Sequence, residues 1–137
     1  MILGLGSDIV DVQRISTLLQ RFPERFLRRV FTEQEQNTAQ KSISPAASYA
    51  KRFAAKEAFL KAIGTGLDND LSWQHIEILN HDNGRPYVNL KGRARERVEA
   101  LTPKGFQARV DITLADTSTL AHAVVILSAI SQSSLEQ

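Results

Sequence analysis

The chain lacks cysteine and has no long apolar run. Without cysteine among its 137 residues it has no disulfide framework and no thiolate nucleophile, and nothing ties it to an oxidising compartment. No stretch approaches the roughly 20 apolar residues of a membrane-spanning helix. The N-terminus has no basic segment and reaches Asp8 too early for a signal peptide. We therefore expect a soluble, cytoplasmic protein that folds as one domain around a single core.

Several kinds of catalytic site are also missing. The three histidines, His75, His81 and His122, lack metal-ligand spacing, which argues against a zinc site. No serine stands in a nucleophile-elbow sequence. Gly64-Thr65-Gly66 follows a predicted helix, whereas a phosphate-binding P-loop precedes one. Carboxylates and basic side chains are left as the groups that could do chemistry.

Acidic residues are scarce between Gln13 and Phe31. This stretch holds five arginines against the single acid Glu24, although the net charge of the chain is only +2. The cluster indicates either a solvated helix face or a docking surface for an acidic partner, whether protein, phosphate or nucleic acid. If the break at Pro23 is gentle, four of these residues line one ridge at helical spacings: Arg14, Arg21, Arg25 and Arg28.

Capping residues predict four helices in the first half of the chain. Asp11 caps a helix that ends before Pro23, and Pro23 starts a further helical turn or helix. Thr32-Glu33-Gln34-Glu35 is a capping-box sequence that opens a short helix toward Lys41. The strongest signals bound a helix over residues 45–63, with Ser44 as its cap, Pro45 at its first position and Gly64 just past its end.

Alternating and apolar stretches predict five strands. They cover residues 2–9, 73–79, 87–90, 106–114 and 120–129, with an Asn-Gly turn within 80–86 and a helix over 93–101 that turns Ala94, Val98 and Leu101 inward. In the first strand, Gly4 and Gly6 share a face with Asp8, as if something approaches the backbone there. We expect one α+β domain, residues 1–131, with an antiparallel sheet packed on a long central helix, and a frayed polar tail at 132–137.

Glu57 is an acid beside the apolar stripe of the 45–63 helix. A carboxylate so placed loses hydration and needs a cationic or donor partner. An ordinary pair with Lys61, one turn away, is the simplest explanation. Asp8 offers a second explanation, because two carboxylates near small residues match how Mg²⁺ is usually held. Lys61 would then reach the same phosphate as a point charge.

These motifs together resemble the holo-[acyl-carrier-protein] synthase family, the small bacterial 4′-phosphopantetheinyl transferases. The similarity covers nearly the whole chain, and order, spacing and length all fit. It rests on GLGSDIV (residues 4–10) with Arg14-Ile15, KRFAAKEAFLKA (51–62), Gly64-Thr65-Gly66, NGRP (83–86) and ITLAD (112–116).

The resemblance implies transfer of 4′-phosphopantetheine from coenzyme A to a serine of apo acyl carrier protein, releasing adenosine 3′,5′-bisphosphate. Asp8 and Glu57 match the family's metal-ligand positions, which implies Mg²⁺, and Lys61 would act with them in catalysis. Glu57 or a metal-bound water would accept the serine proton. The positions implied in coenzyme A binding are Arg52, Lys61, Gly64, Thr65, Gly66, Asn83, Gly84, Arg85 and Pro86.

The resemblance also implies partners. Acyl carrier proteins are acidic, so Arg14, Arg21, Arg25 and Arg28 become the expected docking residues, and neither nucleic acid nor a membrane is expected as a partner. Family members work as homotrimers with active sites between subunits. One departure concerns Asp111, which stands where many members have a histidine. A non-catalytic module that binds RNA or an acidic protein through its arginines is the alternative function.

Overall fold

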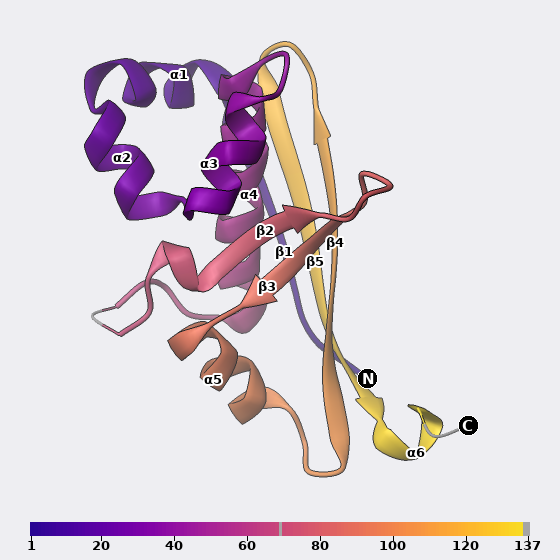
Figure 1. Ribbon diagram of the computed structural model, residues 1–137. Coiled ribbons are helices and arrows are strands. Elements are labelled where there is room, and N and C mark those ends of the chain that lie inside the picture. Colours follow the sequence, from indigo (N-terminus) through magenta and orange to yellow (C-terminus); the bar gives the residue numbers. More distant parts are fainter. Residues whose placement is uncertain (69, 136–137) are drawn as a thin grey trace.

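The computed structural model describes residues 1–68 and 70–135 (Figure 1). Helices and strands alternate irregularly, as expected for an α+β protein. In chain order the elements are β1 (Ile2–Asp11), α1 (Val12–Arg21), α2 (Pro23–Val30), α3 (Glu33–Gln40), α4 (Pro45–Ile63), a 3₁₀ turn (Trp73–His75), β2 (Ile76–Asn80), β3 (Pro86–Leu90), α5 (Gly92–Leu101), β4 (Phe106–Asp116), β5 (Leu120–Ser131) and α6 (Gln132–Leu135).

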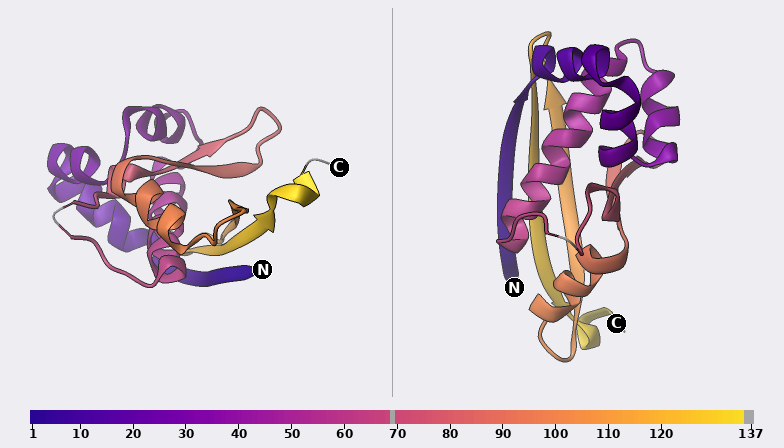
Figure 2. Two further views of the ribbon diagram at one scale, coloured as in Figure 1. Left: turned by 90° about the horizontal axis from the view of Figure 1, so that it is seen from below. Right: turned by 90° about the vertical axis from the view of Figure 1, so that its left-hand side faces the viewer.

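The strands form two antiparallel sheets, so the expectation of one sheet is corrected to two. A three-stranded sheet has the order β1-β5-β4, and β2 pairs with β3 in a separate hairpin. Helix α4 lies along one face of the larger sheet, with the hairpin and the other helices beyond it (Figure 2). No element of the described chain covers the opposite face in either view. The α+β class with a long central helix is confirmed.

Two glycines let α4 approach β1 closely. A Cβ atom added to Gly4 would lie 1.9 Å from the carbonyl oxygen of Ala62, and one added to Gly6 would lie 1.8 Å from that of Ala58. Side chains are therefore excluded at both positions. The sequence predicts a close approach to the backbone at Gly4 and Gly6, and the group that approaches there is the backbone of the central helix α4. The contact fixes the distance between Asp8 on β1 and the side chains of α4.

The predicted helix caps are confirmed. The side chain of Asp11 accepts from the Gln13 amide at 2.9 Å, and Thr32 and Glu35 form the reciprocal capping box. Ser44 caps α4, and Gly64 ends it with a positive φ of 77°. Each of these signals is local to a few residues, which explains why the sequence alone reveals them.

Three details differ from expectation. Trp73–His75 is a 3₁₀ turn, not the start of a strand, because Ser72 caps it through the Gln74 amide. Leu101 is 43 % exposed at the end of α5, whereas Ala94 and Val98 are buried as expected. The polar tail begins with the single helical turn α6, and residues 136–137 lie outside the described range.

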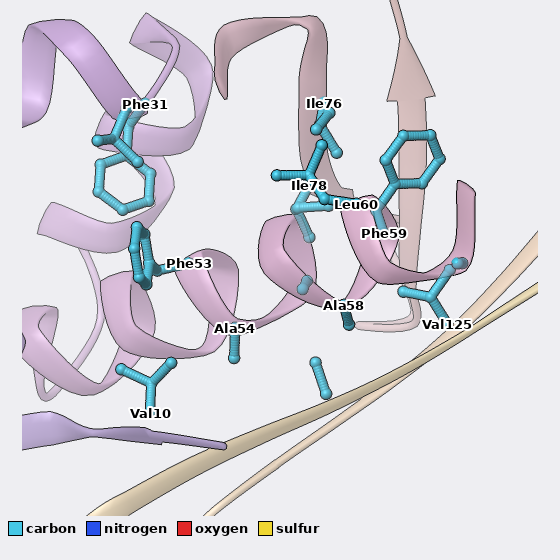
Figure 3. Packing of buried hydrophobic residues seen from close by; sticks show 14 of the residues in the cluster. Val10, Phe31, Phe53, Ala54, Ala58, Phe59, Leu60, Ile76, Ile78 and Val125 are labelled. Atoms are coloured by element: carbon cyan, nitrogen blue, oxygen red, sulfur yellow. The ribbon is translucent and has the colours of Figure 1, made fainter. Parts of the chain in front are cut away.

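The core surrounds α4 on nearly every side. Phe53, Ala58 and Phe59 of this helix are buried, and Phe53 points toward Phe31 at the end of α2 (Figure 3). Val125 contributes from the central strand, and Ile78 contributes from the hairpin. Across the described ranges, no helix combines the length and apolar character that crossing a membrane demands.

A fully buried ion pair fastens α4 to its neighbours. Lys56 Nζ donates to Glu35 Oε1 at 2.8 Å, and both side chains are 0 % exposed. The same ammonium donates to the carbonyls of Trp73 and Ile76 at 3.0 and 2.7 Å. Glu35 in turn accepts from the backbone amides of Thr32 and Ile78. One buried pair thus joins α3, α4 and the start of β2.

Candidate active site

Asp8, Glu57 and Lys61 come together where β1 meets α4. Lys61 Nζ lies 2.8 Å from Asp8 Oδ1 and 3.1 Å from the carbonyl oxygen of Ser7. The Asp8 side chain is 11 % exposed, and the Lys61 side chain is 57 % exposed. The ion pair of Lys61 is therefore with Asp8, and the ordinary Glu57–Lys61 salt bridge is not formed. Glu57 lies close enough to this pair for both Asp8 and Lys61 to shift its pKa.

The two carboxylates lie close enough to disturb each other. Burial raises the pKa of Glu57 to about 7, and the hydrogen bond and negative charge of Asp8 add to this shift. Arg14 and Lys61 oppose the shift only in part. Asp8 Oδ2 is buried and has no hydrogen-bond partner in the described chain. The cations of the cluster therefore leave one buried carboxylate oxygen unsatisfied in the described chain.

Two interacting carboxylates with one unsatisfied oxygen fit a small divalent cation. Mg²⁺ is usually held by one or two carboxylates and keeps its other positions for water and phosphate oxygens. Asp8 and Glu57 supply that number, and the unpartnered Oδ2 supplies an available ligand atom. Within residues 1–68 and 70–135 no cluster of three or more acidic, histidine or cysteine ligands exists. The donor set therefore suits Mg²⁺ better than a metal that needs a full protein cage.

A pocket of about 570 Å³ opens beside this cluster. Lys61 and Glu57 form one wall, and the loop after α4 forms the other. Leu60 and Trp73 supply apolar surface at its base. The loop residues that line it are Gly64, Thr65, Gly66 and Leu67. Four of the residues predicted to bind coenzyme A thus border one pocket: Lys61, Gly64, Thr65 and Gly66.

The loop is held from outside by Arg97 of α5, a residue that sequence reasoning missed. Its guanidinium donates to Thr65 Oγ1 at 2.5 Å and to the Gly66 carbonyl at 3.3 Å, and it pairs with Asp68. Nothing in the sequence separates Arg97 from its neighbours Arg93 and Arg95. All three lie on a polar helix, and only the tertiary structure brings one of them to the loop.

The turn Asn83–Pro86 lies elsewhere in the same chain. It forms the tip of the β2–β3 hairpin, on the side of the molecule away from the 64–68 loop in both orientations (Figures 1 and 2). Arg52 is buried beneath it and donates to Asn80 Oδ1 at 2.6 Å, and Asn80 donates to the Gly84 carbonyl. Arg52 Nε has no partner in the described chain. Arg52 therefore supports the turn instead of lining the pocket.

The arginines of the N-terminal helices do not form one straight ridge. Phe22 has non-helical backbone angles between α1 and α2, and the chain turns sharply there (Figure 1). Arg14 lies over the ring of Phe53, with its guanidinium carbon 5.9 Å from the centroid. Arg25 and Arg28 border a shallow hollow of about 560 Å³. Arg14 is thus nearer the carboxylates, and the other two lie together on α2.

Asp111 is neutralised within its own strand. The Nε atom of Arg109 lies 2.9 Å from Asp111 Oδ2, so this acid is paired. The uncovered face of the sheet also carries apolar side chains, with Leu5 and Ile9 of β1 64 and 63 % exposed. Leu5 is in register with Ile126 of β5, and Ile126 with Asp111 of β4, so apolar and charged residues share this face.

Known proteins match the chain over nearly its whole length. The family model described as the 4′-phosphopantetheinyl transferase superfamily matches residues 4–119. A holo-[acyl-carrier-protein] synthase of Maricaulis maris is 50 % identical over 129 residues, covering 94 % of this chain and 91 % of the relative. One of Rhodopseudomonas palustris (strain TIE-1) is 48 % identical over 141 residues, covering 100 % and 96 %.

Solved structures that are similar to this chain come from the same family of enzymes. The holo-[acyl-carrier-protein] synthase of Neisseria meningitidis is 35 % identical, with a TM-score of 0.79 and coverage of 93 % of this chain and 99 % of that one. The synthase of Helicobacter pylori, solved in complex with coenzyme A, is 28 % identical, with a TM-score of 0.76 and coverage of 90 % and 99 %. The alternative of a non-catalytic binding module is not favoured. The chain belongs to the 4′-phosphopantetheinyl transferase superfamily and, within it, to the holo-[acyl-carrier-protein] synthase family of enzymes.

Proposed function

We propose that this enzyme transfers 4′-phosphopantetheine from coenzyme A to a serine hydroxyl of apo acyl carrier protein in the cytoplasm. The serine hydroxyl loses its proton to Glu57 or to a water, its oxygen forms a bond to the phosphorus that bears pantetheine, and the bond from that phosphorus to adenosine 3′,5′-bisphosphate breaks, so that the bisphosphate leaves with the bonding electron pair. The observation that carries the proposal is the pair of interacting carboxylates, Asp8 and Glu57, beside a pocket with a lysine on its wall.

The residues of the cluster have distinct roles in this proposal. Asp8 and Glu57 would hold Mg²⁺, which when bound would supply positive charge to offset the negative charge that develops on the leaving bisphosphate. Lys61 is already oriented by Asp8 and the Ser7 carbonyl, so its ammonium meets a phosphate without a search for its position. Gly64 and Gly66 leave the loop backbone open to the ligand, since no atom lies within 4 Å of a Cβ added at either position.

The carrier protein docks on α1 and α2. Arg25 and Arg28 present exposed positive charge to an acidic surface, and Arg14 connects this surface to the carboxylate cluster. Arg21 is exposed at the end of α1 and completes the set. Long-range attraction between opposite charges would speed encounter and would weaken as salt is added.

The enzyme acts as a homotrimer in this proposal. The apolar face around Leu5, Ile9 and Ile126 is uncovered in the described chain and would be buried by neighbouring copies. The separation of the Asn83–Pro86 turn from the 64–68 loop within one chain has the same explanation. A neighbouring copy would bring its own turn to the coenzyme A bound at the loop, and Arg52 would act there through the turn.

The experiment is to incubate the protein with apo acyl carrier protein, coenzyme A and Mg²⁺ and to weigh the carrier by mass spectrometry. A mass gain of one phosphopantetheine group, lost when the metal is chelated, is expected. An unmodified carrier would overturn the proposal.

Arg25→Glu is expected to raise KM for the carrier in a salt-dependent way, and a salt-independent loss confined to kcat would contradict the docking role.

A further inference from the structure

We propose that Arg97 is a positioning residue that holds the 64–68 loop in the conformation that binds coenzyme A. This inference rests on the proposed function, because it takes the loop to be part of the coenzyme A site. It adds that α5, which contributes no residue to the lining of the pocket, sets the affinity for this substrate.

Arg97 differs from the other arginines of its helix. The side chains of Arg93 and Arg95 are 44 and 70 % exposed, and each pairs with a glutamate of α5. The side chain of Arg97 is only 15 % exposed, and its polar contacts within the described chain are with the loop. An arginine whose two terminal nitrogens donate to three separate groups has a fixed orientation, which a solvated surface arginine lacks.

The loop has few other attachments at its centre. Its first residues bond back to α4, through the Thr65 amide to the Leu60 carbonyl, and Asp68 caps the turn that follows through the amides of Asp70 and Leu71. Between these two ends, the contacts of Arg97 with Thr65 and Gly66 are the tertiary hydrogen bonds within the described chain. The hydrogen bonds from the Leu71 and Asp70 amides lower the pKa of Asp68, and Arg97 lowers it to a smaller extent.

The contact with the Gly66 carbonyl orients a peptide group toward the substrate. In a trans peptide, the carbonyl of one residue and the N–H of the next point in opposite directions. Since the Gly66 carbonyl faces Arg97, the Leu67 N–H faces away from α5, and no acceptor in the described chain takes it. Leu67 lines the pocket. Its amide is thus available to a phosphate oxygen, and releasing Arg97 would let this peptide rotate.

The test compares Arg97→Met with Arg95→Met, a matched control on the same helix. Steady-state kinetics with coenzyme A and carrier protein varied separately give kcat and both KM values, and hydrogen exchange reports on the loop amides. Arg97→Met is expected to raise KM for coenzyme A about tenfold, with kcat and KM for the carrier within about twofold of wild type, and to speed exchange in the loop alone. Arg97→Lys should fall between, because an ammonium cannot make all three contacts.

Asp68→Asn provides a second perturbation at the other end of the contact. It is expected to raise KM for coenzyme A less than Arg97→Met does, and the double variant should be no worse than Arg97→Met alone. The role of Arg97 would be overturned if Arg95→Met and Arg97→Met raised KM for coenzyme A equally. Additive effects of Arg97→Met and Asp68→Asn on this KM would overturn it as well.

The outcomes also separate this inference from the proposed function. If Lys61→Ala raises KM for coenzyme A while Arg97→Met leaves it unchanged, the positioning role fails and the site stands. If the wild-type chain does not modify the carrier, the proposed function fails and the role of Arg97 fails with it.

Discussion

Lys56 and Glu57 are consecutive residues of α4, yet they belong to charged clusters of opposite kinds. Lys56 donates to three acceptors, and its partner Glu35 accepts from two backbone amides as well. Glu57 faces Asp8, which keeps an unpartnered buried oxygen. In the first cluster, every charged group has its hydrogen-bond partners within the protein, so a ligand would add nothing. In the second, a carboxylate oxygen of Asp8 has no partner in the described chain, and a bound cation with its phosphate ligand would supply one.

The pKa values express the same contrast. Burial lowers the pKa of Lys56, although Glu35 opposes this shift. Burial also disfavours the charged form of Glu77, but hydrogen bonds from Thr32, Asn89 and Lys91 outweigh it and lower the pKa. At Glu57 the surroundings instead raise the pKa to about 7. Among the carboxylates, Glu57 is therefore the functional candidate, because its partners fail to compensate its burial, whereas those of Glu77 succeed. Lys56 lies between the two, since Glu35 offsets its burial only in part.

Breaking the complete cluster has the largest expected effect. Lys56→Met leaves Glu35 as a buried, unpaired acid and is expected to lower the free energy of unfolding by about 3–5 kcal/mol. Lys51→Met is the matched control on the same helix, since Lys51 pairs with Asp116 at the surface and should contribute at most about 1 kcal/mol. Urea denaturation measures both. Equal, small losses would show that the buried pair is not structural.

Breaking the incomplete cluster affects turnover and leaves the fold intact. Glu57→Gln removes one of two repelling carboxylates and one proposed metal ligand, so kcat should fall on the order of 10²–10³-fold without loss of stability. Carrier modification and urea denaturation are measured on the same preparation. Glu96→Gln, on the exposed side of α5, should change neither. Near-normal turnover of Glu57→Gln would remove Glu57 from the site.

Moving α4 disturbs both clusters together. Gly6→Ala places a Cβ against the Ala58 carbonyl, and the helix must shift away from β1, at a cost of about 1–3 kcal/mol. Turnover should also fall, because Asp8 and Glu57 separate. At Gly66 a Cβ meets nothing within 4 Å, so Gly66→Ala should leave the thermal midpoint unchanged. A Gly6→Ala protein as stable as wild type would show that the contact is not tight.

The smallest expected effect is on the stability that Glu77 contributes, and it is seen only at acidic pH. The pKa of Glu77 is lower in the folded chain than in the unfolded one, so its ionised form contributes stability above its ordinary pKa of 4.5. This contribution is lost as the pH falls through the lowered value. The difference in unfolding free energy between wild type and Glu77→Gln should therefore shrink below pH 4.5. A difference that stays constant down to pH 3 would contradict the assignment.

Sequence reasoning succeeded where the physical cause is local. The caps at Asp11, Thr32 and Ser44, and the glycine that ends α4, depend on side chains within a few residues of the backbone they satisfy. The pairing of Asp8 with Lys61 spans 53 positions, and the sequence predicted only that both residues would serve one site. The usual ligand set of Mg²⁺ suggested that link, and the family resemblance strengthened it.

The features it missed depend on tertiary contacts. Nothing near Lys56 distinguishes a fully buried lysine from a solvated one, because its partners come from α3 and the start of β2. Arg97 reads as one of several arginines on a polar helix until the fold brings it to Thr65. The two separate sheets were missed for the same reason, since strand alternation is the same whichever sheet a strand joins.

The pairing of β1 with β5 has a consequence for the order in which the molecule is made. The register joins Ile2 to Ser128 and Asp11 to Leu120, so the first strand synthesised pairs only with the last in the described sheet. Such contacts must close a loop of more than a hundred residues, which slows folding. On the ribosome, β1 has no strand to pair with until β5 emerges. Its other neighbour, α4, is made much earlier, so Asp8 and Glu57 belong to elements that are both complete before the sheet that supports them.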